Sequence, residues 1–292
     1  MSENILDIKG KGVKRVYLWL AVTLYTLLLP HVIVIYRTIV RNYSSKLAGR
    51  VPIFVLIFMG LIFLLISVRK KCWVKTIITT ILSLVIVCSI IKLEPNPNKH
   101  IHIIEYILMA WLLFYLFSLD YKGGGIFILI FICASMLGIV DELQQGLHPA
   151  RYYGLSDMFI NTSSAFVGIL SIIGLGKEDN SVSYGWFKDF SKSLLLPLII
   201  LFNFAGAVIS LAYLFKVQSE GIFTGIYPIW VIGWDVLAIL SSLPYIFSYG
   251  RGIIKNGEGD VTYMLWVFYP LIIMLVMHLV PLIAFTFGIN FK

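Results

Sequence analysis

The sequence predicts an all-α membrane protein, a polytopic bundle of about nine helices that each cross the bilayer. Three observations indicate this fold class. Hydrophobic residues make up 59% of the 292-residue chain, against roughly 45–50% in soluble domains. Charged residues make up only 13%, about half of the usual share. The mean hydropathy is +0.92, and the apolar residues lie in runs of about 20, the length that spans a bilayer.

Each expected helix is one apolar run, joined to the next by a short connection. The longest connection, about residues 176–193, has no room for a soluble domain, which needs at least about 50 residues. We expect an N-terminal hairpin with basic flanks over residues 1–75, a central transmembrane core over 76–175 and a three-span extension over 176–292. The expected spans are residues 16–35, 51–68, 76–92, 101–119, 125–141, 158–175, 194–215, 227–247 and 261–287.

The first span is expected to stay in the mature protein. The run after Arg15 is as long as a full span, and no small-residue cleavage site follows it, so a cleaved signal peptide is not expected. Pro30, followed by His31, predicts a kink in this span. The cysteines show no CxxC spacing and are expected to be small buried hydrophobic residues: Cys72, Cys88 and Cys133.

The basic residues predict the orientation of the chain. The 23 Lys and Arg outnumber the 15 Asp and Glu but lie in short clusters between apolar runs, which is typical of membrane topology and not of nucleic-acid binding. With the N-terminus inside, 14 of the 23 fall on the inner side, so we expect that orientation. The connection at 36–50 is an exception, because it carries Arg37, Arg41, Lys46 and Arg50 on the outer side. Either this connection has a role outside, or one of the first two spans is misplaced.

Ionisable residues concentrate where three expected spans begin or end. Charged groups in a bilayer are costly and usually mark function. Residues 98–106 open the fourth span, 141–151 close the fifth and 156–161 open the sixth. Because successive spans alternate in direction, all three segments lie at one membrane face, which is extracytoplasmic if the N-terminus is inside. We expect their side chains to form one polar cup.

Helical spacing selects the candidate residues of this cup. Residues three, four or seven apart share one side of a helix, whereas Glu105 and Asp141 are expected to face water at the interface. Ser156 is expected to be the N-cap of the sixth span, and Gly168 to allow close helix packing. The candidate ligand-binding residues are Lys99, His102, Tyr106, Glu142, Gln145, Arg151, Asp157 and Asn161.

These three segments resemble the VanZ-like family of bacterial membrane proteins. The family pattern is roughly Asp-Lys-x-x-His-Phe-x-x-Tyr, then Glu-x-x-Gln-x-Phe-x-Pro-Gly-Arg, then Asp-x-x-x-Asn-x-x-Gly-x-x-x-Gly. The positions that match it are Lys99, His102, Tyr106, Glu142, Gln145, Pro149, Arg151, Asp157, Asn161 and Gly168. The departures from it are Asn98, Leu147, Ala150 and Ser164.

The resemblance covers about residues 76–175 and does not extend to residues 190–292. It implies a multi-pass protein of the bacterial cytoplasmic membrane with a role in the cell envelope. The family's founding member is linked to low-level resistance to the glycopeptide teicoplanin, so the resemblance implies a part in antibiotic resistance or envelope homeostasis.

Several chemistries fit the candidate residues. We favour binding of a polar or anionic headgroup of an envelope lipid or lipid-linked precursor, because Arg151 can hold phosphate through two hydrogen bonds and helix N-termini add N–H donors. As an alternative, a hydrolase or transferase would use Glu142 or Asp157 as base and His102 as proton shuttle. A polar network that only joins three helix ends is also open. Glu142 and Asp157 could also ligate a metal together with His102, but no metal is assigned because HExxH and paired CxxC motifs are absent. No cofactor is expected.

The extension carries a further set of intramembrane ionisable residues. Asp235 lies inside the eighth span and must pair, protonate or line a water-filled cavity. If it pairs with His31 or His278, a proton relay becomes a third alternative, in a lipid flippase or a proton-coupled transporter. Otherwise these residues are satisfied packing contacts.

Overall fold

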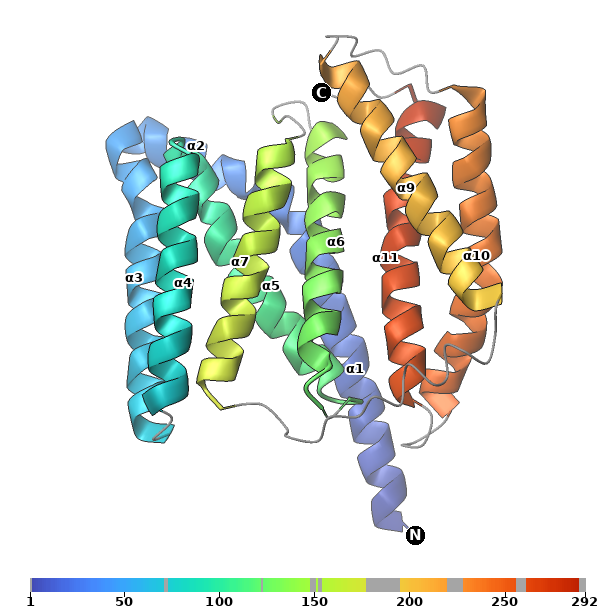
Figure 1. Cartoon of the computed structure of the whole chain (residues 1–292), viewed down its shortest axis with the longest axis horizontal. Helices are drawn as coiled ribbons and strands as arrows, with labels where there is room; N and C mark the ends of the chain where they lie inside the picture. The colour runs from blue at the N-terminus through green and yellow to red at the C-terminus, as the bar shows by residue number, and fades with distance from the viewer. Residues whose placement is uncertain are drawn as a thin grey trace. The chain divides into compact units, whose positions relative to one another are not determined.

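The computed structural model has the expected all-α architecture, with no strand in the residues that it describes (Figure 1). Eight helical segments among these residues are long and apolar enough to cross a membrane, and Leu198–Leu214 is a shorter apolar helix at the place of the expected span 194–215. The described residues are 2–70, 73–121, 123–147, 151, 154–176, 195–219, 228–255 and 261–288.

The helices follow the expected spans closely. They are α1 (Ser2–Leu28), η1 (Leu29–His31), α2 (Val32–Asn42), α3 (Ser45–Lys70), α4 (Trp73–Leu93), η2 (Pro97–His100), α5 (Ile101–Phe117), α6 (Ile126–Leu147), α7 (Leu155–Gly174), α9 (Leu195–Ser219), α10 (Ile229–Lys255) and α11 (Val261–Thr286). The chain forms two compact units. The first comprises Arg15–Gly138 and Gly154–Val182, and the second comprises Met1–Lys14, Ile139–Tyr153 and Ser183–Lys292.

At the place of the predicted kink, a 3-10 turn at Leu29–His31 separates α1 from α2. The prediction that residues 36–50 form a connecting loop is wrong. Helix α2 continues to Asn42, and α3 begins at Ser45. In α2, Arg37 and Arg41 are four residues apart and lie on the side of the helix opposite Ile35 and Ile39, which is the pattern of an amphipathic helix.

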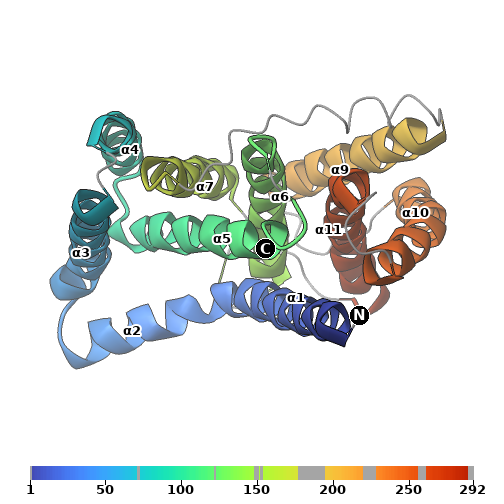
Figure 2. The same ribbon diagram turned by 90° about the horizontal axis from the view of Figure 1, so that it is seen from below.

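Helix α5 is the central helix of the first unit. Figure 2 shows it between α1–α2 on one side and α7 on the other. Close packing against α7 depends on Gly168, because a Cβ atom there would lie 2.7 Å from the Cβ of Ala110 and 2.9 Å from the carbonyl oxygen of Ile107. The expectation that Gly168 allows helices to approach is therefore met. By contrast, α3 exposes most of its surface, as expected for a helix whose solvent is lipid.

Two opposite ends of the first unit can be recognised from its contacts. At one end, which we call the Lys99 end, the start of α3 contacts η2, and Lys99 lies 2.8 Å from Asp157 at the start of α7. At the other, which we call the Lys70 end, Lys70 donates to the carbonyl of Leu175 at 3.5 Å. Helices α3, α4 and α7 thus run between the same two ends, as the alternation of spans predicts.

The exposure of the cysteines differs between an inner helix and an outer helix of the first unit. Cys133 is buried in α6, as expected, whereas Cys88 is exposed on α4. The prediction of burial was wrong for Cys88 because an apolar residue on an outer helix can face lipid instead of protein. Cys72 lies outside the described residues.

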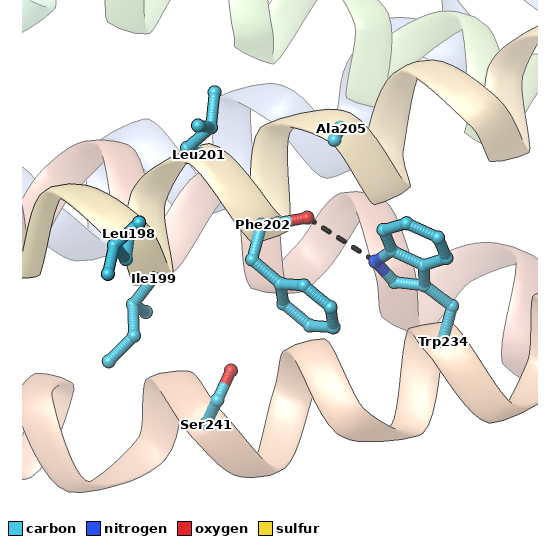
Figure 3. A pocket seen from close by; sticks show the side chains of 7 residues that line it. All are labelled: Leu198, Ile199, Leu201, Phe202, Ala205, Trp234 and Ser241. Atoms are coloured by element: carbon cyan, nitrogen blue, oxygen red, sulfur yellow. Dashed lines mark hydrogen bonds between the residues drawn. The ribbon is translucent and has the colours of Figure 1, made fainter. Parts of the chain in front are cut away.

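In the second unit, α9, α10 and α11 pack against one another. A groove of about 510 Å³ lies between α9 and α10 (Figure 3). One wall is formed by Phe202 and Trp234, whose rings stack at 5.1 Å between centroids. The lining residues are apolar except for Ser241: Leu198, Ile199, Leu201, Phe202, Ala205, Trp234 and Ser241.

Candidate functional site

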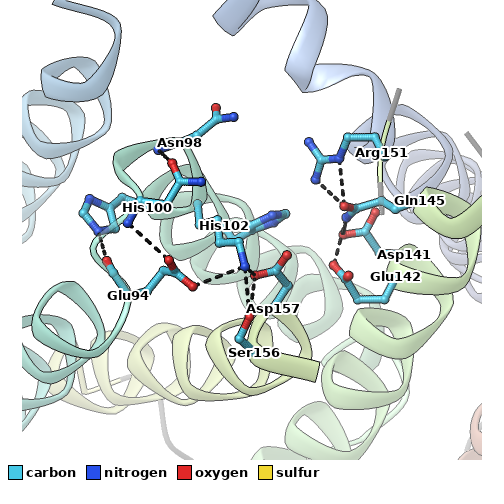
Figure 4. A network of polar contacts seen from close by, with 12 residues as sticks. Glu94, Asn98, His100, His102, Asp141, Glu142, Gln145, Arg151, Ser156 and Asp157 are labelled. Atoms are coloured by element: carbon cyan, nitrogen blue, oxygen red, sulfur yellow. Dashed lines mark hydrogen bonds and ion pairs between the residues drawn. The ribbon is translucent and has the colours of Figure 1, made fainter. Parts of the chain in front are cut away.

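At the Lys99 end, one lysine connects three segments of the chain. The Nζ atom of Lys99 lies 2.8 Å from Asp157 Oδ1, 3.2 Å from Glu94 Oε2 and 2.9 Å from the Ser156 hydroxyl (Figure 4). These partners come from the first turn of α7 and from the residue that follows α4. We call these residues, together with His102 and Glu105, the Lys99 group.

A short 3-10 helix positions Lys99. Pro97 occupies the beginning of η2, and the side chain of Asn96 accepts a hydrogen bond from the Asn98 backbone at 3.1 Å. Proline and an Asn cap are both typical of a helix start. The helical segment therefore begins four residues before the expected start at 101, and Lys99 belongs to it.

The role expected for Ser156 was wrong. The N-cap of α7 is Gly154, which has no capping side chain. The Ser156 hydroxyl instead accepts from Lys99 and donates to Asp157 Oδ1 at 3.3 Å. The serine therefore contributes to the Lys99 group and not to the end of its own helix.

Buried next to these residues is a histidine–carboxylate pair. His102 Nδ1 lies 2.8 Å from Glu105 Oε2, one helical turn along α5. The expectation that Glu105 faces water was wrong, because its side chain is turned inward toward the imidazole and is buried. A ring nitrogen of His102 and a carboxylate oxygen of Asp157 also lie within 4.8 Å of each other. These two residues could each supply a ligand to a metal ion.

Deeper in the first unit, Asn161 approaches α6 where that helix has a glycine. A Cβ at Gly138 would lie 3.0 Å from the Cβ of Asn161 and 3.4 Å from the ring of Tyr106. The Tyr106 hydroxyl donates to the carbonyl of Leu137 at 3.4 Å. Asn161 is 0% exposed, and neither polar atom of its amide has a hydrogen-bond partner among the described residues. Leaving such a group unpaired costs about 1–3 kcal/mol.

A second set of candidates is bonded together at the end of α6. Gln145 Nε2 donates to Asp141 Oδ2 at 3.1 Å and to Glu142 Oε1 at 2.9 Å. Gln145 Oε1 accepts from Arg151 Nε at 2.9 Å and from a second guanidinium nitrogen (Figure 4). We call these four residues the Gln145 group. The expected shared face of Glu142 and Gln145 is confirmed.

In the Gln145 group, the burial of Asp141 differs from the expectation, and Arg151 makes an additional contact. Asp141 is 0% exposed and does not face water, because Gln145 lies one turn further along α6 and bonds to it. The contact of Arg151 with the amide oxygen of Gln145 is not indicated by the sequence. Pro149, which matches the VanZ-like pattern, and Ala150, which departs from it, lie outside the described residues.

Sequence reasoning identified Asp235 in the second unit but missed three polar residues that accompany it, Asn203, Ser210 and Ser242. Asn203 and Ser210 are seven residues apart in α9, and Asp235 and Ser242 are seven apart in α10. That spacing places each pair on one helix face. All four are buried. The same periodicity, applied to weakly polar residues inside apolar runs, would have found them.

Comparisons with known proteins give no assignment. No family model matches the chain, and neither a curated protein nor a solved structure is significantly similar to it. The VanZ-like resemblance therefore depends on the matching residues of the sequence alone.

Proposed function

We propose that the chain is a VanZ-like membrane protein of the bacterial envelope that binds the headgroup of a phosphate-containing lipid or lipid-linked precursor at the Lys99 end. We further propose that this binding contributes to tolerance of teicoplanin-type glycopeptides. The observation that carries the proposal is the amide of Asn161, which is fully buried and has no hydrogen-bond partner among the described residues. A polar ligand gains most where it satisfies such a group.

The charges at the Lys99 end favour a ligand with two kinds of polar group. The Lys99 group is acidic, because Glu94, Glu105 and Asp157 outnumber the single lysine. It therefore favours hydroxyl or amino donors of a headgroup. The exposed part is basic, because α2 and the start of α3 carry four Lys and Arg, and no acidic residue occurs between Asp7 and Glu94. This surface favours phosphate.

A matched pair of ligands tests the proposal. Farnesyl pyrophosphate and farnesol share one prenyl tail, and only the first carries the anionic group. We expect farnesyl pyrophosphate to raise the thermal midpoint of the purified full chain and farnesol to leave it unchanged. Lys99→Met should reduce that increase several-fold. Lys92→Met, which removes the same charge from an exposed position at the same end, should retain it.

The same variants test the cellular role. In a teicoplanin-susceptible bacterium, expression of the wild-type chain and of Lys92→Met should raise the inhibitory concentration, and Lys99→Met should not. Arg151→Gln tests whether the Gln145 group takes part in binding. Equal stabilisation by farnesol, or equal losses in Lys92→Met and Lys99→Met, would contradict the proposal.

The His102–Glu105 pair favours a second candidate function, hydrolysis of the bound headgroup. A carboxylate that orients an imidazole is the usual arrangement around a general base. Under this alternative, the protein releases phosphate from farnesyl pyrophosphate, and His102→Gln stops the release but keeps the thermal stabilisation. Under the binding proposal no phosphate is released.

A further inference from the structure

A buried acid–base pair joins two helices of the second unit. Asp235 in α10 and His278 in α11 are 1% and 0% exposed, and Asp235 Oδ1 lies 2.7 Å from His278 Nδ1. The hydroxyl of Ser210, from α9, donates to the same carboxylate oxygen at 3.1 Å. Helices α9, α10 and α11 therefore meet at Asp235.

The other ring nitrogen of His278 also faces an oxygen. His278 Nε2 lies 3.1 Å from the backbone carbonyl oxygen of Asn203. The Asn203 side chain is fixed in turn, because its oxygen accepts from Ser242 at 2.9 Å and its nitrogen donates to the carbonyl of Ile199 at 2.9 Å. The imidazole thus lies between two acceptors that the surrounding helices hold in place.

The donors and acceptors around the imidazole determine how many protons the Asp235–His278 pair needs for both of its contacts to be hydrogen bonds. A neutral imidazole has one N–H donor and one lone pair, whereas a carboxylate and a carbonyl only accept. With a neutral His278 and an ionised Asp235, one of the two contacts brings lone pairs together. One added proton, on the imidazole or on the carboxyl, makes both contacts hydrogen bonds and changes the net charge of the pair from −1 to zero.

The position of the pair inside two membrane-spanning helices also favours the binding of one proton. Both α10 and α11 contain candidate membrane spans, and a net charge inside a bilayer is costly. The polar groups that α9 turns toward the pair are the Ser210 hydroxyl and the Asn203 carbonyl. Neither group changes its charge near neutral pH. Proton binding therefore removes both the mismatched contact and the buried charge.

We propose that Asp235 and His278 form an intramembrane proton-binding site, which takes up one proton from water and releases it again. This inference does not depend on the proposed headgroup binding at the Lys99 end. The groove of the second unit lies close to the site, because a Cβ atom at Gly206 would lie 2.5 Å from the indole nitrogen of Trp234, which lines the groove, and 3.1 Å from Cε1 of His278. The site therefore shares its helix segments with the walls of the groove.

Infrared difference spectra of the full chain in lipid bilayers, recorded from about pH 5 to about pH 8, test the proposal. We expect carboxyl and imidazole bands that change together, with the uptake of one proton. Asp235→Asn and His278→Gln should each abolish the whole signal. Asp235→Glu keeps a titratable group at this position and should retain the signal. This variant distinguishes the loss of the carboxyl group from misfolding caused by substitution at residue 235.

The matched control is Ser242→Ala, which removes a hydrogen bond of the same buried cluster but no titratable group. This variant should keep the signal, with helix content and elution volume like those of the wild type. Identical pH-difference spectra in the wild type, Asp235→Asn and His278→Gln would overturn the proposal. A folded Ser242→Ala that loses the signal as completely as Asp235→Asn would also overturn it, because the signal would then follow helix packing.

Discussion

At the scale of single residues, two buried asparagines of this chain differ in one respect that can be tested. Asn161 and Asn203 are both 0% exposed and both lie inside helices. Neither amide atom of Asn161 is hydrogen bonded among the described residues. The amide of Asn203 is bonded through both its oxygen and its nitrogen. Selection for stability alone would replace Asn161 and keep Asn203.

We therefore expect opposite effects from one substitution at these two sites. Asn161→Leu replaces an unpaired polar group by an apolar one of similar size and should stabilise the chain by about 1–3 kcal/mol, while it abolishes stabilisation by farnesyl pyrophosphate. Asn203→Leu should destabilise the chain by a similar amount, because it removes the hydrogen bonds of the Asn203 amide with the Ser242 hydroxyl and with the Ile199 carbonyl. Thermal unfolding with and without the ligand measures both effects. An Asn161→Leu chain that still responds fully to the ligand would remove the amide from the site.

Residue-scale burial was the least predictable property of the sequence. Glu105 and Asp141 look like interfacial carboxylates because they lie near helix ends. In the structure both are buried: the imidazole of His102, one turn before Glu105, lies 2.8 Å from its carboxylate, and Gln145, one turn after Asp141, donates a hydrogen bond to its carboxylate. Spacing along one helix indicates such a pair. Whether the pair turns inward depends on neighbouring helices that the spacing does not describe.

At the scale of the helix, some glycines lie where two helices pack closely and others lie where there is open space around the helix. Gly168 of α7 packs against α5, where a Cβ would come within 2.9 Å of the Ile107 carbonyl oxygen, an atom of the backbone that cannot move aside. Gly60 of α3 has nothing within 4 Å of the same added atom. The two positions therefore form a matched test of helix packing.

Gly168→Ala should destabilise the chain by about 1–3 kcal/mol, because overpacking forces helices apart. Gly60→Ala should be neutral or stabilise by up to about 1 kcal/mol, because alanine is the better helix former. Unfolding in a denaturing detergent measures the difference between the two variants. Equal effects would show that α5 and α7 are not packed as closely as described.

Helix positions were predicted better than helix ends and connections. Runs of apolar residues located the spans because a bilayer leaves a helix few alternatives to a run of that length. The same rule misassigned residues 36–50, because a run of apolar residues does not show where an amphipathic helix continues beyond it. Arginines also fit one face of an amphipathic helix, and the positions of Ile35 and Ile39 on the face opposite Arg37 and Arg41 indicate that alternative.

At the scale of the whole molecule, sidedness determines what the Lys99 end can bind. Helix α3 is unbroken over 26 residues, or about 39 Å at 1.5 Å per residue, which exceeds the roughly 30 Å of a bilayer core. Its first turn lies at the Lys99 end and its last turn at the Lys70 end. One helix therefore reports the orientation of the entire first unit.

Cysteine labelling along α3 tests the expected orientation. Lys46 and Arg69 are both exposed, near opposite ends of this helix. In a chain whose own cysteines are replaced by alanine, Lys46→Cys should react with a membrane-impermeant maleimide in intact cells. Arg69→Cys should react only after permeabilisation, because basic residues near short loops are retained inside.

The two labelled positions serve as controls for each other, since they differ only in the end of α3 that they occupy. The reverse pattern would place the Lys99 end in the cytoplasm. Headgroup binding would then remain physically reasonable, because inner-leaflet lipids also carry phosphate. A direct part in tolerance of teicoplanin, which acts from outside the cell, would lose its basis, because the site and the antibiotic would lie on opposite sides of the bilayer.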